Sequence, residues 1–251
     1  MTRTAKAPEQ ELNRVNDLSQ RVHTAIRRRV LAGTYPPGTE MKQANIAQEF
    51  QVSRGPVREA FRRLEEEGLL DSAFNLRSTV TKLNAADIAV VYGARIAMES
   101  YAIAITTGTL TPSMLGRARS ALDGMFLAGG AGDLEGWNEA HFEFHGSLTA
   151  SVGGVVAKTL DSYRRRCDRY VNFYHGARPD APLERMHEHV DLLESVQGTD
   201  GDASARLLAE HLATTVSELL HVTDRQHDLP IVEQAVRMAT SSLEQESINE
   251  L

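Results

Sequence analysis

The chain reads Val52-Ser-Arg-Gly-Pro-Val-Arg-Glu-Ala-Phe-Arg-Arg-Leu-Glu-Glu-Glu-Gly68, and this segment predicts a short amphipathic helix. Ser53 is a favourable N-cap, and Pro56 falls in the first turn, where a missing backbone N–H costs little. Apolar residues recur every three or four positions, as on the packed face of a helix: Val57, Phe61 and Leu64. The arginines lie off that face, at the helix start and along its exposed side: Arg54, Arg58, Arg62 and Arg63.

A helix that packs by one side and presents arginine from its N-terminal end suits insertion into the major groove of DNA. The plainer interpretation is a solvated amphipathic helix, and the flanking sequence argues against it. A second short helix is predicted over 42–50, and Gln51-Val52 leaves room only for a tight turn, as in a helix-turn-helix. A longer amphipathic helix precedes both over 18–31 and ends at Gly33 and Pro36-Pro37.

Two short strands are predicted at 69–70 and 79–81, so the order is three helices followed by a β-hairpin wing. With this order the segment resembles the GntR family of bacterial transcription regulators. The resemblance covers about seventy residues at the expected spacing. The residues that carry it are Pro36-Pro37-Gly38, Ile46-Ala47, Val52-Ser53-Arg54, Pro56-Val57-Arg58-Glu59-Ala60, Arg63-Leu64 and Gly68-Leu69.

The resemblance implies a winged helix-turn-helix over residues 16–83 that binds double-stranded DNA, after a flexible tail over 1–15. Arg54 and Arg58 are the residues expected to reach base edges, and Arg62 and Lys42 those expected to reach phosphates. Ser53 and Gly55 are expected at the turn that approaches the DNA closely. The usual Arg-Gly tip of the wing is replaced by Leu76-Arg77, so Arg77 is the candidate for a minor-groove contact.

The charges divide unequally along the chain. Residues 1–82 hold fourteen Lys and Arg against ten Asp and Glu, whereas residues 83–251 hold thirteen against twenty-four, and together they give the net charge of −7. Attraction to phosphate depends on the local field, so the acidic total does not argue against DNA binding. The N-terminal third of the chain, here called the head, is therefore basic, and the rest of the chain is acidic.

Length and composition suit two globular domains in a reducing compartment. The chain has 251 residues, of which 41% are hydrophobic and 24% are charged, and a single cysteine, Cys167, so it can form no internal disulfide. The N-terminus is polar through Gln20, unlike a signal peptide. No apolar run approaches the roughly 20 residues that span a bilayer. We therefore expect a cytoplasmic protein with no membrane partner.

Long helical patterns follow one another from Asn84 onward, which predicts a mainly α protein. Caps, prolines and glycines mark the ends of six helices, and short connections between them are typical of a helical bundle. The predicted helices run over 84–107, 111–128, 133–151, 154–175, 182–197 and 202–224. These helices form a domain over 84–229, and the tail over 230–251 is predicted to add one helix at 231–243.

This second half resembles the FCD domain, the ligand-binding domain of the FadR-like branch of GntR regulators. The residues that carry the match are Arg95, Glu99, Phe144-His145, Glu188-His189 and His211-Leu212. The resemblance implies a metal held by an Asp and three His from three helices, beside a bound carboxylate effector. It also implies a homodimer, whose two heads would read a near-palindromic operator.

The histidine spacing predicts a metal site independently of the resemblance. His141 and His145 are four residues apart, so both project from one helical face and can share one ion. His189 and His211, on two later helices, could close the pocket. Each histidine taken singly is more simply a surface or capped residue. His187 competes with His189, but residues two apart face nearly opposite sides of a helix, and the family pattern selects His189.

His141 stands where the family pattern has Asp. A set of four imidazoles favours Zn²⁺, or alternatively Ni²⁺, over Mg²⁺ or Ca²⁺. Arg95 is the candidate for the effector's carboxylate, because a guanidinium binds that group bidentately; a helical pair with Glu99 is the equal alternative. Other candidate lining residues are Tyr92, Trp137, Asn138 and Tyr163. The arginines at 164–166 and Arg169 are interpreted as a partly solvated face, or one that approaches phosphates or an acidic helix.

A metalloenzyme is the less favoured alternative. The segment His141-Phe-Glu-Phe-His145 is not the His-Glu-x-x-His motif, and Glu143 points away from any ion that these histidines hold. The sequence is therefore interpreted as a homodimeric transcription regulator, most simply a repressor, that responds to a small organic acid. The alternative from another class is a metal-dependent helical sensor whose head contacts protein instead of DNA.

Overall fold

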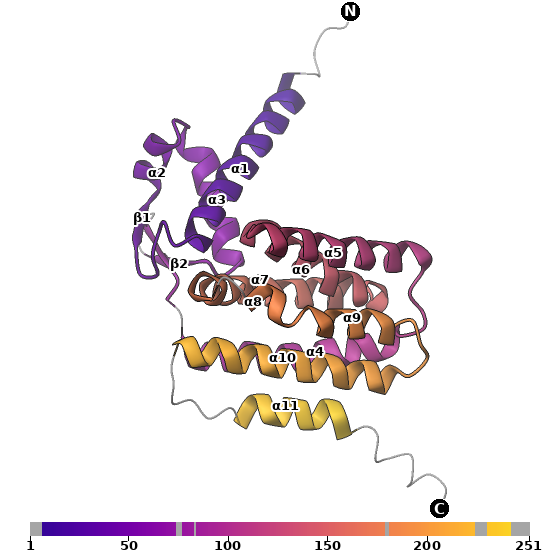
Figure 1. Ribbon diagram of the computed structural model, residues 1–251. Helices are drawn as coiled ribbons and strands as arrows, with labels where there is room; N and C mark the ends of the chain where they lie inside the picture. Colours follow the sequence, from indigo (N-terminus) through magenta and orange to yellow (C-terminus); the bar gives the residue numbers. More distant parts are fainter. Residues whose placement is uncertain (1–6, 74–76, 83, 179–180, 224–229, 242–251) are drawn as a thin grey trace, which may run out of the picture. The chain divides into compact units, whose positions relative to one another are not determined.

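This computed structural model describes residues 7–73, 77–82, 84–178, 181–223 and 230–241. The chain forms two compact units, Met1–Leu83 and Asn84–Leu251. The first unit, the head, contains three helices and three short strands (Figure 1). Its elements are α1 (Ala7–Leu31), β1 (Glu40–Lys42), α2 (Gln43–Glu49), α3 (Arg54–Glu66), β2 (Leu70–Ala73) and β3 (Arg77–Val80).

The predicted recognition helix is α3, and its apolar face forms the centre of the head. Val57, Phe61 and Leu64 are at most 1% exposed and share one core with Ile26 of α1. The turn before α3 is tight, because the Val52 amide donates to the Ala47 carbonyl at 2.9 Å. The expected helix-turn-helix is therefore confirmed.

Three details of the head differ from the prediction. Helix α1 begins at Ala7, within the tail predicted to be flexible over 1–15 and before the predicted helix start at 18. Ser53 occupies the N-cap position of α3 in extended conformation, but its side chain makes no capping hydrogen bond. Lys42 is the last residue of β1, a third strand that was not predicted, and it occupies the N-cap position of α2. A strand of only three residues shows too little alternation to be recognised.

The sheet has the order β1-β3-β2 and is antiparallel throughout. Ser78 in the central strand lies opposite Met41 of β1 and Ser72 of β2. The predicted wing is therefore present and is extended by β1. The tip at Leu76 lies outside the described residues.

The second unit, the bundle, contains helices only, among the residues that the structure describes (Figure 1). Its longer helices are α4 (Ala85–Thr106), α5 (Pro112–Ala131), α6 (Leu134–Leu148), α7 (Gly154–Ala177), α9 (Met186–Ser195), α10 (Gly201–Thr223) and α11 (Pro230–Thr240). Shorter pieces are the 3₁₀ turn η1 (Ala150–Val152) and α8 (Ala181–Glu184). The predicted mainly α fold is confirmed.

Local side-chain and glycine caps set several of the helix boundaries. The side chains of Asn84, Thr111 and Asp133 accept backbone hydrogen bonds in the first turns of α4, α5 and α6. Helix α5 runs past its predicted end at 128, because the residue that takes the left-handed conformation is Gly132, with φ of 68°. The predicted single helix over 182–197 is divided at Arg185 into α8 and α9.

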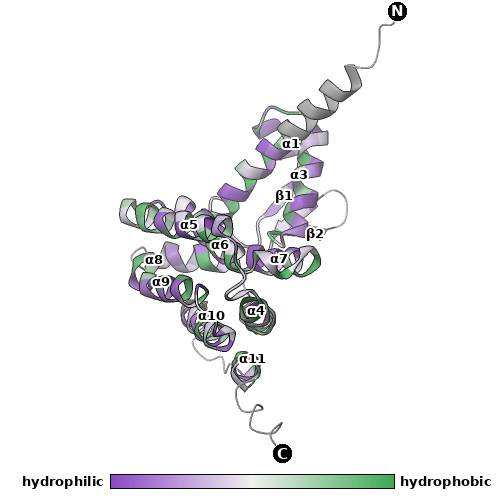
Figure 2. Cartoon of the chain, turned by 90° about the vertical axis from the view of Figure 1, so that its right-hand side faces the viewer, coloured by the Kyte–Doolittle hydropathy of each residue, from purple (hydrophilic) through white to green (hydrophobic). Residues whose placement is uncertain are grey.

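Helix α4 is the apolar centre of the bundle. In the end-on view of Figure 2 it lies between α7 on one side and α10 and α11 on the other. By length and composition alone α4 could cross a bilayer, which corrects the expectation that no segment approaches a membrane span. Its tight packing and its buried charged pair, Arg95 and Glu99, are those of a core helix.

Candidate functional site

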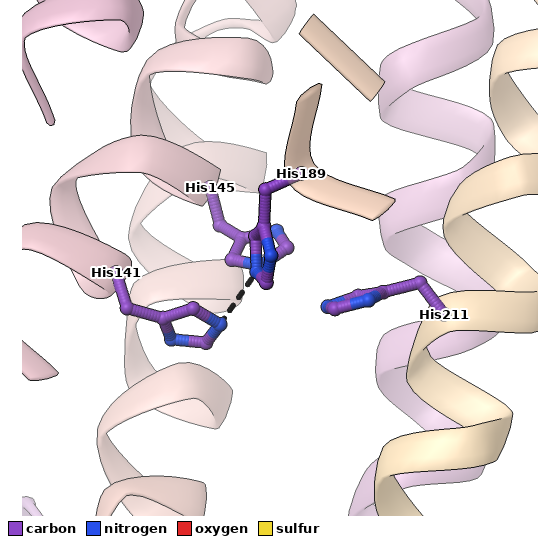
Figure 3. Close-up of side chains that lie close together, drawn as sticks. All are labelled: His141, His145, His189 and His211. Carbon is purple, nitrogen blue, oxygen red and sulfur yellow. Dashed lines mark hydrogen bonds between the residues drawn. The ribbon is translucent and has the colours of Figure 1, made fainter. Parts of the chain in front are cut away.

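Three helices bring the four predicted histidines together. Helix α6 supplies His141 and His145, α9 supplies His189 and α10 supplies His211. One ring nitrogen from each histidine lies within 4.8 Å of the others, and Figure 3 shows the rings turned toward one another. The Nε2 atoms of His141 and His145 are 3.1 Å apart. Such a set of nitrogen donors could hold a metal ion.

Burial keeps the four imidazoles neutral, which is the form that binds metal. His145, His189 and His211 are 2%, 3% and 6% exposed, and His141 is partly buried. Burial lowers the pKa of all four. Repulsion between the rings adds to this for His141, His145 and His189, whose pKa lies well below the usual range. No proton therefore competes for their lone pairs near neutral pH.

The hydrogen bonding of the histidines also fits a metal. Among the residues that the structure describes, neither ring nitrogen of His189 has a hydrogen-bond partner, although the side chain is buried. An unsatisfied buried polar group is costly, and an ion would supply the missing partner. His211 is held from the other side, because its Nδ1 lies 2.6 Å from Oε2 of Glu188. The residues present thus fit a divalent transition metal.

Two neighbouring residues, His187 and Glu143, face away from the histidine cluster. His187 is exposed, as expected if His189 faces inward. Glu143 is exposed and lines a separate groove on the α5 side of α6, so it cannot act on an ion among the histidines. His175, which was not predicted to have a role, is buried edge-on to Trp137, and Trp137 stacks on His141 at 4.7 Å. No spacing in the sequence indicated this contact.

Arg95 lies beside the histidine cluster and forms a buried ion pair with Glu99. Its Nε donates to Oε1 of Glu99 at 2.8 Å, and the two side chains are 4% and 0% exposed. The ion pair between Arg95 and Glu99 on one helix, which was the alternative to effector binding, is therefore present. Arg95 also lines the cavity beside His141 and His145, so its pairing with Glu99 leaves it next to any ligand there.

Arg164 completes this charged group and corrects one prediction. Instead of lying on a solvated face, Arg164 is 3% exposed and donates to Oε2 of Glu99 and to Oγ1 of Thr149. Its position on α7 turns it inward, whereas Arg166, two residues later, is exposed. Two guanidinium groups thus share the fully buried carboxylate of Glu99, and Arg164 also pairs with Asp161 at 3.0 Å.

The cavity that these groups line is small. Its lining residues are Arg95, Asn138, His141, Phe142, His145, Arg164, Cys167, Asp168 and Val171. The volume of about 20 Å³ has room for about one water molecule. Asn138 lines the cavity, as predicted. Tyr92 and Tyr163, which were also candidates, are not among the lining residues; the ring of Tyr92 packs against the guanidinium of Arg95. A ligand of several atoms would therefore require movement of lining side chains.

The candidate DNA-binding residues lie at one end of α3 and in the sheet. Arg54 and Arg58 are exposed, and within the described part of the chain neither forms a hydrogen bond or ion pair. Arg62 instead pairs with Glu59 and Glu66 on its own helix. Lys42 and Arg77 both pair with Glu40, at 3.6 and 3.4 Å. Ser53 and Gly55 are exposed at the start of α3.

A winged helix-turn-helix with exposed arginines on its recognition helix, followed by a helical bundle, defines a DNA-binding transcription regulator. The chain belongs to the gntR family of bacterial regulatory proteins. That family matches residues 18–75, and the FCD domain family matches residues 90–214. Members of this class regulate transcription and are not enzymes.

Named relatives extend over most of the chain. The HTH-type transcriptional repressor RspR of Escherichia coli K12 is 27% identical over 88% of this chain and 96% of its own length. The galactonate operon transcriptional repressor of the same strain is 23% identical over 82% and 98%. Among solved structures, E. coli McbR/YncC superposes with a TM-score of 0.71 at 22% identity, covering 82% of this chain and 99% of the other. This structural likeness supports the fold.

Proposed function

We propose that this protein is a homodimeric transcriptional repressor whose bundle binds a metal ion and a small organic acid. Two heads would bind the half-sites of a near-palindromic operator. Arg54 and Arg58 would contact base edges, with Ser53 and Gly55 at the closest approach. Arg62 and Lys42 would contact phosphates, and Arg77 would reach the minor groove. The DNA-binding assignment depends on Arg54 and Arg58 at the start of α3, which are exposed and have no pairing partner within the described part of the chain.

The four histidines would hold the metal, Zn²⁺ or alternatively Ni²⁺. Four neutral nitrogen donors within 4.8 Å support this assignment, since imidazole suits these ions better than it suits Mg²⁺ or Ca²⁺. When bound, the ion would supply a Lewis acid next to the cavity. The repressor role agrees with the names of the relatives, two of which are transcriptional repressors. The homodimer and the cytoplasmic location are part of the proposal.

Arg95 would bind the carboxylate of the effector. Arg95 and Arg164 both line the cavity, and their guanidinium groups would attract an anion there. An incoming carboxylate would compete with Glu99 for Arg95 and so act on α4, the helix that directly follows the head in the chain. The ligand would alter operator binding only if it prefers one arrangement of the heads.

Metal analysis and DNA binding test the proposal together. The protein, purified without an affinity tag or chelator, should carry about one Zn or Ni per chain. At low salt it should retard the DNA upstream of its own gene, and the complex should weaken as salt rises. Carboxylic acids added to the metal-loaded protein should change the affinity for this DNA. No retardation at low salt would instead favour a sensor that acts through protein contacts.

A further inference from the structure

Glu188 connects the histidine cluster to the surrounding helices. It belongs to α9, where it directly precedes His189, but its side chain reaches His211 of α10. Its Oε2 lies 2.6 Å from Nδ1 of His211. A carboxylate accepts hydrogen bonds, so Nδ1 carries the proton and Nε2 keeps its free lone pair. The ring of His211 also stacks on His145, with ring centres 5.3 Å apart, which fixes its plane.

Arg185 holds the carboxylate of Glu188 in place. Its Nε donates to Oε1 of Glu188 at 2.7 Å, and its Nη2 contacts Oε2. The same guanidinium donates to the backbone carbonyl of His211 at 3.1 Å and to Oγ1 of Thr215 at 3.2 Å. Both the carboxylate and the turn of α10 that carries His211 are thus fixed by one residue, so the geometry exists before any ion binds.

We propose that Glu188 is the positioning residue of the metal centre, and that it supplies through His211 the negative charge that four neutral imidazoles lack. This inference rests on the proposed metal site. A carboxylate hydrogen-bonded to the outer nitrogen of a ligating histidine fixes its tautomer and increases the basicity of the inner nitrogen. Among the four histidines, His211 is the one whose ring contacts a carboxylate in the described part of the chain.

Glu188 also forms a salt bridge, so a purely structural role has to be separated from positioning. The test compares Glu188→Gln, which keeps an acceptor for Nδ1 but removes the charge, with Glu218→Gln. Glu218 is the matched control, because it pairs with the same Arg185, at 3.4 Å, and accepts from Tyr174 at 3.0 Å. No contact between Glu218 and the four histidines is present among the described residues.

The measurements are Zn²⁺ affinity, by competition with a chromophoric chelator, and the visible absorption spectrum of the Co²⁺-loaded full chain. Glu188→Gln should bind Zn²⁺ about 10- to 100-fold more weakly than the wild type and shift the Co²⁺ bands. Glu218→Gln should leave both unchanged. Equal affinity and an identical spectrum for Glu188→Gln, or equal weakening in both variants, would overturn the inference.

A measurement on the unmodified protein removes any dependence on how the variant folds. In metal-free protein labelled with ¹⁵N-histidine, the ring signals of His211 should show the proton on Nδ1. A proton on Nε2 would overturn the assignment, because the lone pair would then face away from the cluster. If the wild type binds neither Zn²⁺ nor Co²⁺, the proposed metal centre itself fails; if it binds them and Glu188→Gln is unaffected, only the role of Glu188 fails.

Discussion

Arg164 of α7 donates from Nε and Nη2 to one carboxylate oxygen of Glu99 in α4, at 3.3 Å in each case. The other oxygen accepts from Arg95. Attraction to Arg164 and Arg95 lowers the pKa of Glu99 in spite of its complete burial, so the carboxylate stays ionised. One buried negative charge therefore holds two buried positive charges at the edge of the histidine cavity.

Glu99→Gln should strongly destabilise the bundle. The substitution leaves Arg95 and Arg164 buried without a full counter-charge, and removal of one partner from a buried ion pair costs about 3–5 kcal/mol. The measurement is the free energy of unfolding in urea. The control is Glu143→Gln, also in the bundle but exposed, where a change within about 0.5 kcal/mol is expected. Similar effects of the two substitutions would show that the buried network contributes little.

The sequence allowed most of the fold and the clustering of the four histidines to be predicted, because both depend on helical periodicity. His141 and His145 are one turn apart on one helix, and caps such as Asn84 and Thr111 mark helix starts locally. The strand β1 was missed because three residues carry too little pattern. Arg164 was misjudged because its burial depends on Glu99, which lies 65 residues away in the chain. The contacts of His175 with Trp137 and of Glu188 with His211 could not be predicted, because they depend on packing between helices.

Arg58→Ala should weaken binding to the operator by about 1–3 kcal/mol and relax its specificity, because a bidentate contact to a base would be lost. Fluorescence anisotropy on the DNA upstream of the gene and on a scrambled duplex measures both effects. Arg62→Ala is the comparison: its guanidinium already pairs with Glu59 and Glu66, so a smaller loss, similar on both duplexes, is expected. An equal loss on both duplexes for Arg58→Ala would contradict base reading.

Removal of metal should lower stability in the wild type and leave His145→Ala unaffected. A ligand that binds only the native state stabilises it by about 2.7 kcal/mol at a concentration one hundred times its Kd. Urea unfolding with added Zn²⁺ and with excess chelator gives the difference for each protein. His187→Ala, an exposed histidine on α9, should respond to metal like the wild type. A full response to metal in His145→Ala would remove this residue from the ligand set.

The stability of the metal-free protein should fall as the pH falls from about 6.5 toward 4. Burial lowers the pKa of His175 to about 4, so between these values the unfolded chain binds a proton that the native state does not. The native state is therefore favoured fully above the unfolded pKa and loses this contribution as the pH falls toward the folded pKa. One pKa unit corresponds to about 1.4 kcal/mol, so His175 accounts for about 3 kcal/mol at most.

His175→Phe isolates this contribution, since phenylalanine keeps a ring against Trp137 but cannot take up a proton. With excess chelator present, the loss of unfolding free energy between pH 7.5 and 4.5 should be about 2–3 kcal/mol smaller in the variant than in the wild type. His187→Phe provides the control at an exposed position and should keep the wild-type profile. Parallel profiles for the wild type and His175→Phe would mean that His175 becomes protonated within the folded bundle, and that its contact with Trp137 tolerates the charge.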